Sequence, residues 1–195
     1  MVSLPAGRQA GDLLLLGCQG RDNLMNWSAA GYTSLVGPIG PGGLPMELQY
    51  TWASASEPDS IIVTNTTGRN GWSCSITTLR GGVGSGNPLA APVVTQIGTS
   101  RSMTAPALGS LPDGALVTRW FASADDNSHG TPSEGTLAFG GSAYDGVIGV
   151  QHASSMSYVL HTPAGDRGNA TMLQTLNSPD AFIGVSVALL PGTAP

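Results

Sequence analysis

The sequence predicts an all-β fold: a single antiparallel β-sandwich domain of jelly-roll-like form, with long surface loops, over residues 1–195. Three observations predict it. Apolar and polar residues alternate with a period of two over short segments, which is the pattern of a strand with one buried face. Turn residues separate these segments, drawn from 28 glycines and 14 prolines. No segment shows three turns of an amphipathic helix, and no linker divides the chain.

Three segments carry the alternation most clearly. Residues 47–53 place Leu, Tyr and Trp on one face of a strand and Glu, Gln and Thr on the other. Residues 72–77 alternate Trp, Cys and Ile with Ser and Thr. Residues 183–189 alternate large aliphatic residues with Gly, Ser and Ala, which predicts a strand buried on one face and lightly covered on the other.

Shorter runs of the same kind predict the rest of the two sheets. Gly, Pro and Asp mark turns between the runs, as in Leu111-Pro112-Asp113-Gly114, because Pro presets φ and Gly accepts a positive φ. Residues 170–176 also fit one short helical turn. The remaining strands are expected at 12–19, 32–36, 60–65, 92–98, 102–108, 115–122, 146–153, 157–161 and 170–175.

Three segments are expected to be loops. Residues 37–45 and 81–88 hold too many glycines and prolines to pair inside a sheet. Residues 123–142 form a longer irregular segment that is rich in acidic and amide residues. Because long loops on a rigid sheet usually carry the contacts with partners, this segment is the expected contact region.

The charge of the chain is low and negative. Charged residues make up 10% of the chain, all seven basic residues are arginines, and the formal net charge is −5. Scattered arginines do not form the basic patch that a nucleic acid needs, so no nucleic-acid partner is expected. A weakly charged surface repels its own copies little, which favours a homo-oligomer. No apolar run is long enough for a membrane span or a signal-peptide core, so we expect folding in the cytoplasm.

The two cysteines, Cys18 and Cys74, each fall on an expected strand. In a reducing cytoplasm we expect two buried free thiols that pack as small apolar side chains. A disulfide is possible only if the two strands face each other.

No pattern indicates catalysis, a cofactor or a metal. The sequence lacks a Gly-x-Ser-x-Gly elbow and a nucleotide-binding glycine loop, and its three histidines lack zinc-ligand spacing. Asp125, Asp126 and Asn127 with Glu134 offer oxygen atoms to Ca²⁺, but they do not match an EF-hand loop, so a solvated acidic loop is favoured. An acid/base pair of a glycosidase shows no recognisable spacing either.

The aromatic residues divide into two groups. Those within the expected strands, Trp52, Trp72 and Trp120, are assigned to the core. Others lie at strand edges or in loops, where an exposed ring can stack on a sugar or form the centre of an interface. The candidate contacts to a partner or a glycan are Trp27, Tyr32 and Tyr144, together with the loop acids Asp125 and Asp126.

The order of several motifs resembles a group of β-sandwich domains common in virion proteins of tailed bacteriophages. The motifs are Gly11-Asp12 before the leucines 13–16, Gly31-Tyr32-Thr33-Ser34-Leu35, Tyr-Thr-Trp-Ala-Ser-Ala-Ser-Glu-Pro at 50–58, Leu79-Arg80-Gly81, and 185–191. They span nearly the whole chain. None of these motifs contains a catalytic residue.

The resemblance implies a jelly-roll-like structural protein of the virion, assembled in the host cytoplasm. A capsid decoration or cement protein is the first expectation, with the major capsid protein, other virion proteins and its own copies as partners. A receptor-binding or carbohydrate-binding module of a tail or fibre, which would bind a host surface glycan, is the alternative. A glycan-degrading enzyme that uses Glu134 or Asp125 is the third possibility.

Overall fold

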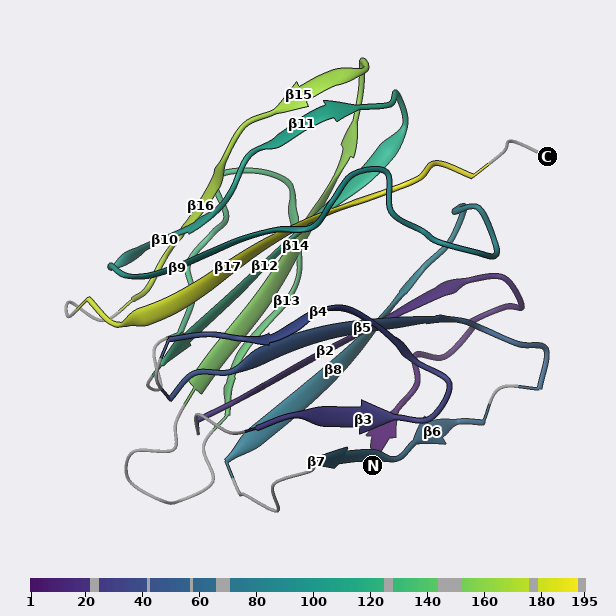
Figure 1. Ribbon diagram of the computed structural model, residues 1–195, viewed down its shortest axis with the longest axis horizontal. Coiled ribbons are helices and arrows are strands. Elements are labelled where there is room, and N and C mark those ends of the chain that lie inside the picture. The colour runs from purple at the N-terminus through teal and green to yellow at the C-terminus, as the bar shows by residue number, and fades with distance from the viewer. Residues whose placement is uncertain are drawn as a thin grey trace.

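The computed structural model describes residues 1–21, 25–41, 43–56, 58–65, 71–124, 128–143, 152–175 and 179–192. Within these ranges every regular element is a strand, and the two largest sheets face each other as the layers of an antiparallel β-sandwich (Figure 1). This confirms the predicted fold class. The described part of the chain contains no helix that could cross a membrane.

Two main sheets form the sandwich, and smaller strand pairs lie outside each of them (Figure 1). The first sheet has the order β13 (Thr136–Ala143), β14 (His152–His161), β12 (Ala115–Ala124), β17 (Ala181–Leu189) and β9 (Val94–Thr99). The second has the order β4 (Thr33–Ile39), β5 (Met46–Trp52), β2 (Leu13–Gly20) and β8 (Trp72–Leu79). The outer pairs are β1 (Val2–Ser3) with β6 (Ser60–Ile61), β3 (Trp27–Ala29) with β7 (Val63–Asn65), β10 (Ser102–Ala105) with β16 (Ala170–Leu173), and β11 (Leu108–Leu111) with β15 (Gly165–Arg167).

The central core fills the space between the two main sheets. Leu13 and Leu15 of β2 pack against Trp120 of β12 and against Val185 and Val187 of β17. These residues occupy alternate positions on their strands, as the period of two requires. The alternation that predicted the strands therefore also selects the residues of this core.

Further apolar layers cover the outer faces of both main sheets. Leu16 of β2 packs with Trp27 and Val63 of the outer pair β3–β7. Phe121 of β12 packs with Met103 of β10 on the other side of the molecule. Strands β2 and β12 are therefore buried on both faces, which explains why the leucine run at 13–16 is unbroken.

The outer face of strand β17 lies under strand β10, whereas the sequence predicted only light cover on that face. Gly184 lies directly beneath β10, and a Cβ atom there would lie 1.9 Å from the carbonyl oxygen of Thr104. Only glycine permits this close approach of two backbones. The small residues of 183–189 therefore make room for a further layer.

Two expected loops are partly strand. β13 lies within 123–142, where its pair Gly140-Gly141 hides the alternation of a strand. β4 continues through Pro38 to Ile39, inside the expected loop 37–45. Proline is tolerated there because β4 is an edge strand, whose one neighbour among the described strands is β5.

Several other strands differ from the predicted ones in their bounds. β14 is one strand from His152 to His161, where two were expected, and residues 144–151 lie outside the described ranges. The expected strand 102–108 is divided at Pro106 into β10 and β11. Residues 170–173 form β16 and not a helical turn. Residues 81–88 contain no strand, as expected.

Cys18 and Cys74 form a disulfide, so the expectation of two free thiols was wrong. Strands β2 and β8 are neighbours, and their register places Cys18 directly opposite Cys74. Their Cα atoms lie 4.1 Å apart. This short separation is typical of a non-hydrogen-bonded antiparallel pair, in which the two side chains are closest. The sequence placed each cysteine on a strand but did not show that the strands are adjacent.

Buried polar side chains attach the outer pairs to the main sheets. Glu47 of β5 accepts a hydrogen bond from the backbone N–H of Trp27 (3.2 Å), and Gln49 donates to the carbonyl oxygen of Trp27 (2.9 Å) and to Glu47 (2.8 Å). These bonds fix β3 over β5. Because Glu47 and Gln49 are hydrogen-bonded, part of the cost of burying these polar side chains is offset.

Candidate functional site

The two main sheets end on the same side of the molecule, at β8 and β13, and a groove runs between these edge strands. The edge groove has a volume of about 600 Å³ and is lined by residues 5–8 and 75–78, Arg80, Ala138 and Phe139. Its two arginines are paired, Arg8 with Asp59 (3.1 Å) and Arg80 with Asp12 (2.8 Å).

Of the two ion pairs, the one between Arg80 and Asp12 has more hydrogen bonds. Arg80 donates to both oxygens of the Asp12 carboxylate, at 2.9 and 2.8 Å, and the backbone N–H of Gln9 donates to the same carboxylate at 2.7 Å. The hydrogen bonds from Arg80 hold the pKa of Asp12 below its usual value. The groove therefore carries balanced charges at its arginine end.

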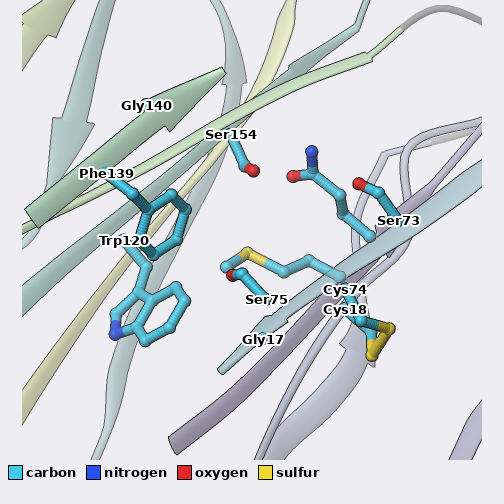
Figure 2. A pocket seen from close by; sticks show the side chains of 11 residues that line it. Gly17, Cys18, Ser73, Cys74, Ser75, Trp120, Phe139, Gly140 and Ser154 are labelled. Carbon is cyan, nitrogen blue, oxygen red and sulfur yellow. A yellow bond between two sulfur atoms is a disulfide. The ribbon is translucent and has the colours of Figure 1, made fainter. Parts of the chain in front are cut away.

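Next to the groove, a smaller cavity reaches between the two sheets, and we call it the edge pocket (Figure 2). Its volume is about 200 Å³. The lining residues come from β2, β5, β8, β12, β13 and β14, and they are Gly17, Cys18, Gln19, Met46, Ser73, Cys74, Ser75, Trp120, Phe139, Gly140 and Ser154.

Small side chains leave this space open. The alternate residues of β8 that face the central core are Ser73, Ser75, Thr77 and Leu79, so the side chains become shorter toward the pocket. The opposing strand β14 presents Ser154 there. Figure 2 shows Ser73, Ser75 and Ser154 around the space, whereas the disulfide lies to one side of it. A core that elsewhere holds leucine and valine is here lined with hydroxyl groups.

Two aromatic rings form the apolar wall of the edge pocket. Trp120 and Phe139 meet edge to face, with centroids 5.6 Å apart and an interplanar angle of 67°. Trp120 lies against Gly17, where a Cβ atom would come within 2.4 Å of its ring. The Trp120 indole donates to Thr118 (3.1 Å), so its polar atom is satisfied. Trp120 is buried, while Phe139 is partly exposed at the mouth.

Gln19 is the least satisfied polar group of the edge pocket. Its side chain is 3% exposed, yet among the described residues Oε1 has no hydrogen-bond partner. An unsatisfied buried acceptor costs about 1–3 kcal/mol of desolvation. Ser73 lies opposite Gln19 in the register of β2 and β8, and its Oγ atom lies 2.9 Å from Nε2 of His152.

The five predicted contact residues do not come together at this pocket. Trp27 is 2% exposed and lies in an outer core, so the expectation of an accessible Trp27 ring was wrong. Tyr32 is partly buried against the same core. Asp125, Asp126 and Tyr144 lie outside the described residues. The edge pocket was not predicted, and the sequence signal that could have indicated it is the run of Ser and Thr on alternate positions of β8.

The remaining polar candidates have structural bonds. Glu134 binds the buried Arg119 (3.2 Å) and also pairs with Arg167 (2.5 Å). His129 lies between Ser123 (2.9 Å) and Ser155 (2.7 Å). No group of three or more potential metal-binding side chains occurs in the described ranges.

The chain matches no protein-family model, no curated protein and no solved structure. Function is therefore inferred from the geometry and from the resemblance of the sequence motifs.

Proposed function

We propose that the protein is a non-enzymatic structural component on the exterior of a tailed-bacteriophage particle. Its role would be that of a capsid decoration protein, which binds the major capsid protein and its own copies. The observation that carries this proposal is the edge strand β8, which pairs with β2 on one side and with no strand on its other side among the described residues.

β8 has the properties of a strand that accepts a partner. It has eight residues, no charge, no proline and no register shift against β2, and all eight residues are partly exposed. Natural proteins usually protect such an edge with lysines, prolines or bulges. The edge strand β4 of the same sheet has this protection, since it contains Pro38 and two register shifts.

The register of β8 against β2 shows which backbone N–H and C=O groups of β8 point toward its free side. The pair Cys18–Cys74 is of the non-hydrogen-bonded kind, so the backbone N–H and C=O of Cys74 point away from β2. By the alternation of the ladder, the same holds for Ile76 and Thr78. An extended segment of a neighbouring protein can therefore pair with β8 by strand addition.

The other main sheet also carries exposed apolar side chains. Leu137 of β13 is 44% exposed, and Leu160 of β14 is 59% exposed. Such side chains contribute contact area when a partner covers them. Together with the low charge of the chain, they support association with little electrostatic repulsion.

A pair of matched substitutions tests the use of β8. Thr77→Lys places a charge on β8 at a residue that lines the edge groove, and Thr95→Lys places the same charge on β9, the free edge of the five-stranded sheet. Sedimentation should show self-association of the wild type, at least tenfold weaker association of Thr77→Lys, and no change for Thr95→Lys. The opposite order of the two variants would reject β8 as the contact.

A particle experiment tests the place of the protein. Particles made with and without the gene are imaged by electron microscopy and heated in the presence of a chelator. We expect external density that disappears with the gene, and earlier rupture of the particles that lack it. Particles with identical density and identical resistance would contradict the proposal.

A further inference from the structure

The edge pocket contains an acceptor that the protein does not satisfy. Gln19 lines the cavity, and its Oε1 atom is buried and has no partner among the described residues. Such a group is normally bonded in a native structure, by protein or by an occupant of the site. An occupant with a hydroxyl group would supply the missing donor.

The rest of the lining suits a ligand with several hydroxyl groups and one apolar face. Ser75 and Ser154 present hydroxyls that both donate and accept, and Phe139 presents a partly exposed ring at the mouth (Figure 2). A pyranose ring combines these properties, because its hydroxyls lie around the rim and its C–H groups lie on the face.

The charge and the size of the edge pocket further limit the class of ligand that it can bind. None of the eleven described lining residues is acidic or basic, so a charged ligand would lose its hydration without gaining an ion pair. A volume of about 200 Å³ is below the roughly 300–1,000 Å³ of drug-sized sites. The space therefore fits one ring and not an oligosaccharide.

We propose that the edge pocket binds one neutral sugar ring, with Gln19 as the acceptor for a ring hydroxyl and Phe139 against the C–H face. The ring is either a free monosaccharide or the terminal unit of a glycan. This inference does not depend on the position of the protein in a particle.

A titration monitored by NMR tests the site directly. The probes are the neutral hexoses glucose, galactose and mannose, their methyl glycosides, and glucuronic acid as a charged counterpart. We expect millimolar binding of at least one hexose, with shifts in the Gln19 side-chain amide and the Trp120 indole signals. Glucuronic acid should bind at least tenfold more weakly.

The methyl glycosides separate the two sources of the ring. Binding of a methyl glycoside as strong as that of the parent hexose assigns the pocket to the end of a glycan. Binding of the free hexose alone assigns it to a monosaccharide. If no neutral sugar shifts the Gln19 or Trp120 signals, the proposal is rejected.

A matched pair of variants tests the role of Gln19. Gln19→Leu removes the acceptor with little change in volume, and Gln96→Leu makes the same change on the exposed face of β9. We expect Gln19→Leu to weaken binding five- to tenfold and Gln96→Leu to leave it unchanged. Equal binding by both variants would overturn the assignment.

A second pocket variant covers the case in which Gln19→Leu does not fold. Ser154 is partly exposed, so Ser154→Val narrows the pocket at a position that tolerates substitution. Loss of sugar binding by this variant, with an unchanged melting temperature, supports the site. Unchanged sugar binding rejects it.

Discussion

Arg119 is a fully buried cation that bonds to four separate segments of the chain. Its guanidinium donates to the carbonyl oxygens of Pro106 and Gly168, to Ser186 Oγ (2.6 Å) and to Glu134 (3.2 Å). Burial lowers the pKa of Arg119 from its usual value, and the Glu134 carboxylate acts against this. One side chain of β12 thus attaches the loops of both outer pairs on this face.

Replacing Arg119 should therefore destabilise the protein strongly. Arg119→Leu removes the donor to the carbonyl oxygen of Gly168 and one of the two donors to that of Pro106, which keeps Ser186 Oγ, and it leaves Glu134 without its buried partner. We expect the free energy of unfolding to fall by about 3–5 kcal/mol. Arg167→Leu removes the partly exposed partner of Glu134 and should cost about 1 kcal/mol or less. Urea unfolding curves of both variants measure the difference. Equal losses would contradict the role of Arg119.

His129 is held in a chain of hydrogen bonds with a definite direction. The hydroxyl of Ser155 donates to the sulfur of Met172 (2.9 Å), so Ser155 Oγ accepts from Nδ1 of His129, and Nε2 is left to accept from Ser123. Protonation of Nε2 would turn it from an acceptor into a donor, so the Ser123 hydroxyl would have to give up its present direction and accept. Burial lowers the pKa of His129 to about 4.

This pKa predicts a loss of stability in mild acid. The unfolded chain binds a proton to His129 near pH 6.5, whereas the folded protein does so only near pH 4. The free energy of unfolding should therefore fall by up to roughly 3 kcal/mol between these pH values. His129→Asn should remove this part of the pH dependence, as measured by denaturation at several pH values. A variant with the same acid slope as the wild type would exclude His129 as the cause.

At the scale of elements, period-two patterning located most of the long strands. β2, β5, β8, β12 and β17 lie where alternation or an apolar run predicted them. β13 was missed because its glycines carry no pattern, and β1, β3 and β15 were missed because two or three residues are too few for a pattern. The outer strands β6, β7, β10 and β16 lie within predicted strands. The local sequence therefore identifies a strand when the residues of one face are clearly more apolar than those of the other, or when both faces are apolar.

The sequence did not predict which strands pair or which core each strand face packs against, because both depend on segments that are far apart in the chain. Alternation shows that Trp72, Cys74 and Ile76 share a face, but it does not show that this face packs under β3 and not into the central core. The edge pocket was missed for this reason, since Ser73 and Ser75 were read as the outward face of the strand.

The disulfide between β2 and β8 should stabilise the fold by closing a long loop. The two cysteines are 56 residues apart in the sequence, and a loop of this length corresponds to about 2–4 kcal/mol. We expect Cys18→Ala with Cys74→Ala to lower the melting temperature under oxidising conditions. Reducing agent should lower the melting temperature of the wild type by a similar amount and leave the double variant unchanged. If reducing agent also lowered the melting temperature of the double variant, the loss of stability could not be attributed to the disulfide.

At the scale of the molecule, the two main sheets and their outer layers form successive packed layers. The doubly covered strands β2, β12 and β17 should therefore open only when the whole protein unfolds. Hydrogen exchange should show the slowest amides in these strands and faster exchange in the short pair β1–β6. Rapid exchange in β12 would show that the layers open separately.

The position of the disulfide has a mechanical consequence. It joins the edge strand β8, which we propose as the contact with neighbouring proteins, to β2, which lies between two apolar layers. A pulling force applied by a neighbour on β8 passes through a covalent bond into β2. The strand at the margin cannot be peeled away alone, and the load is shared by the interior of its sheet.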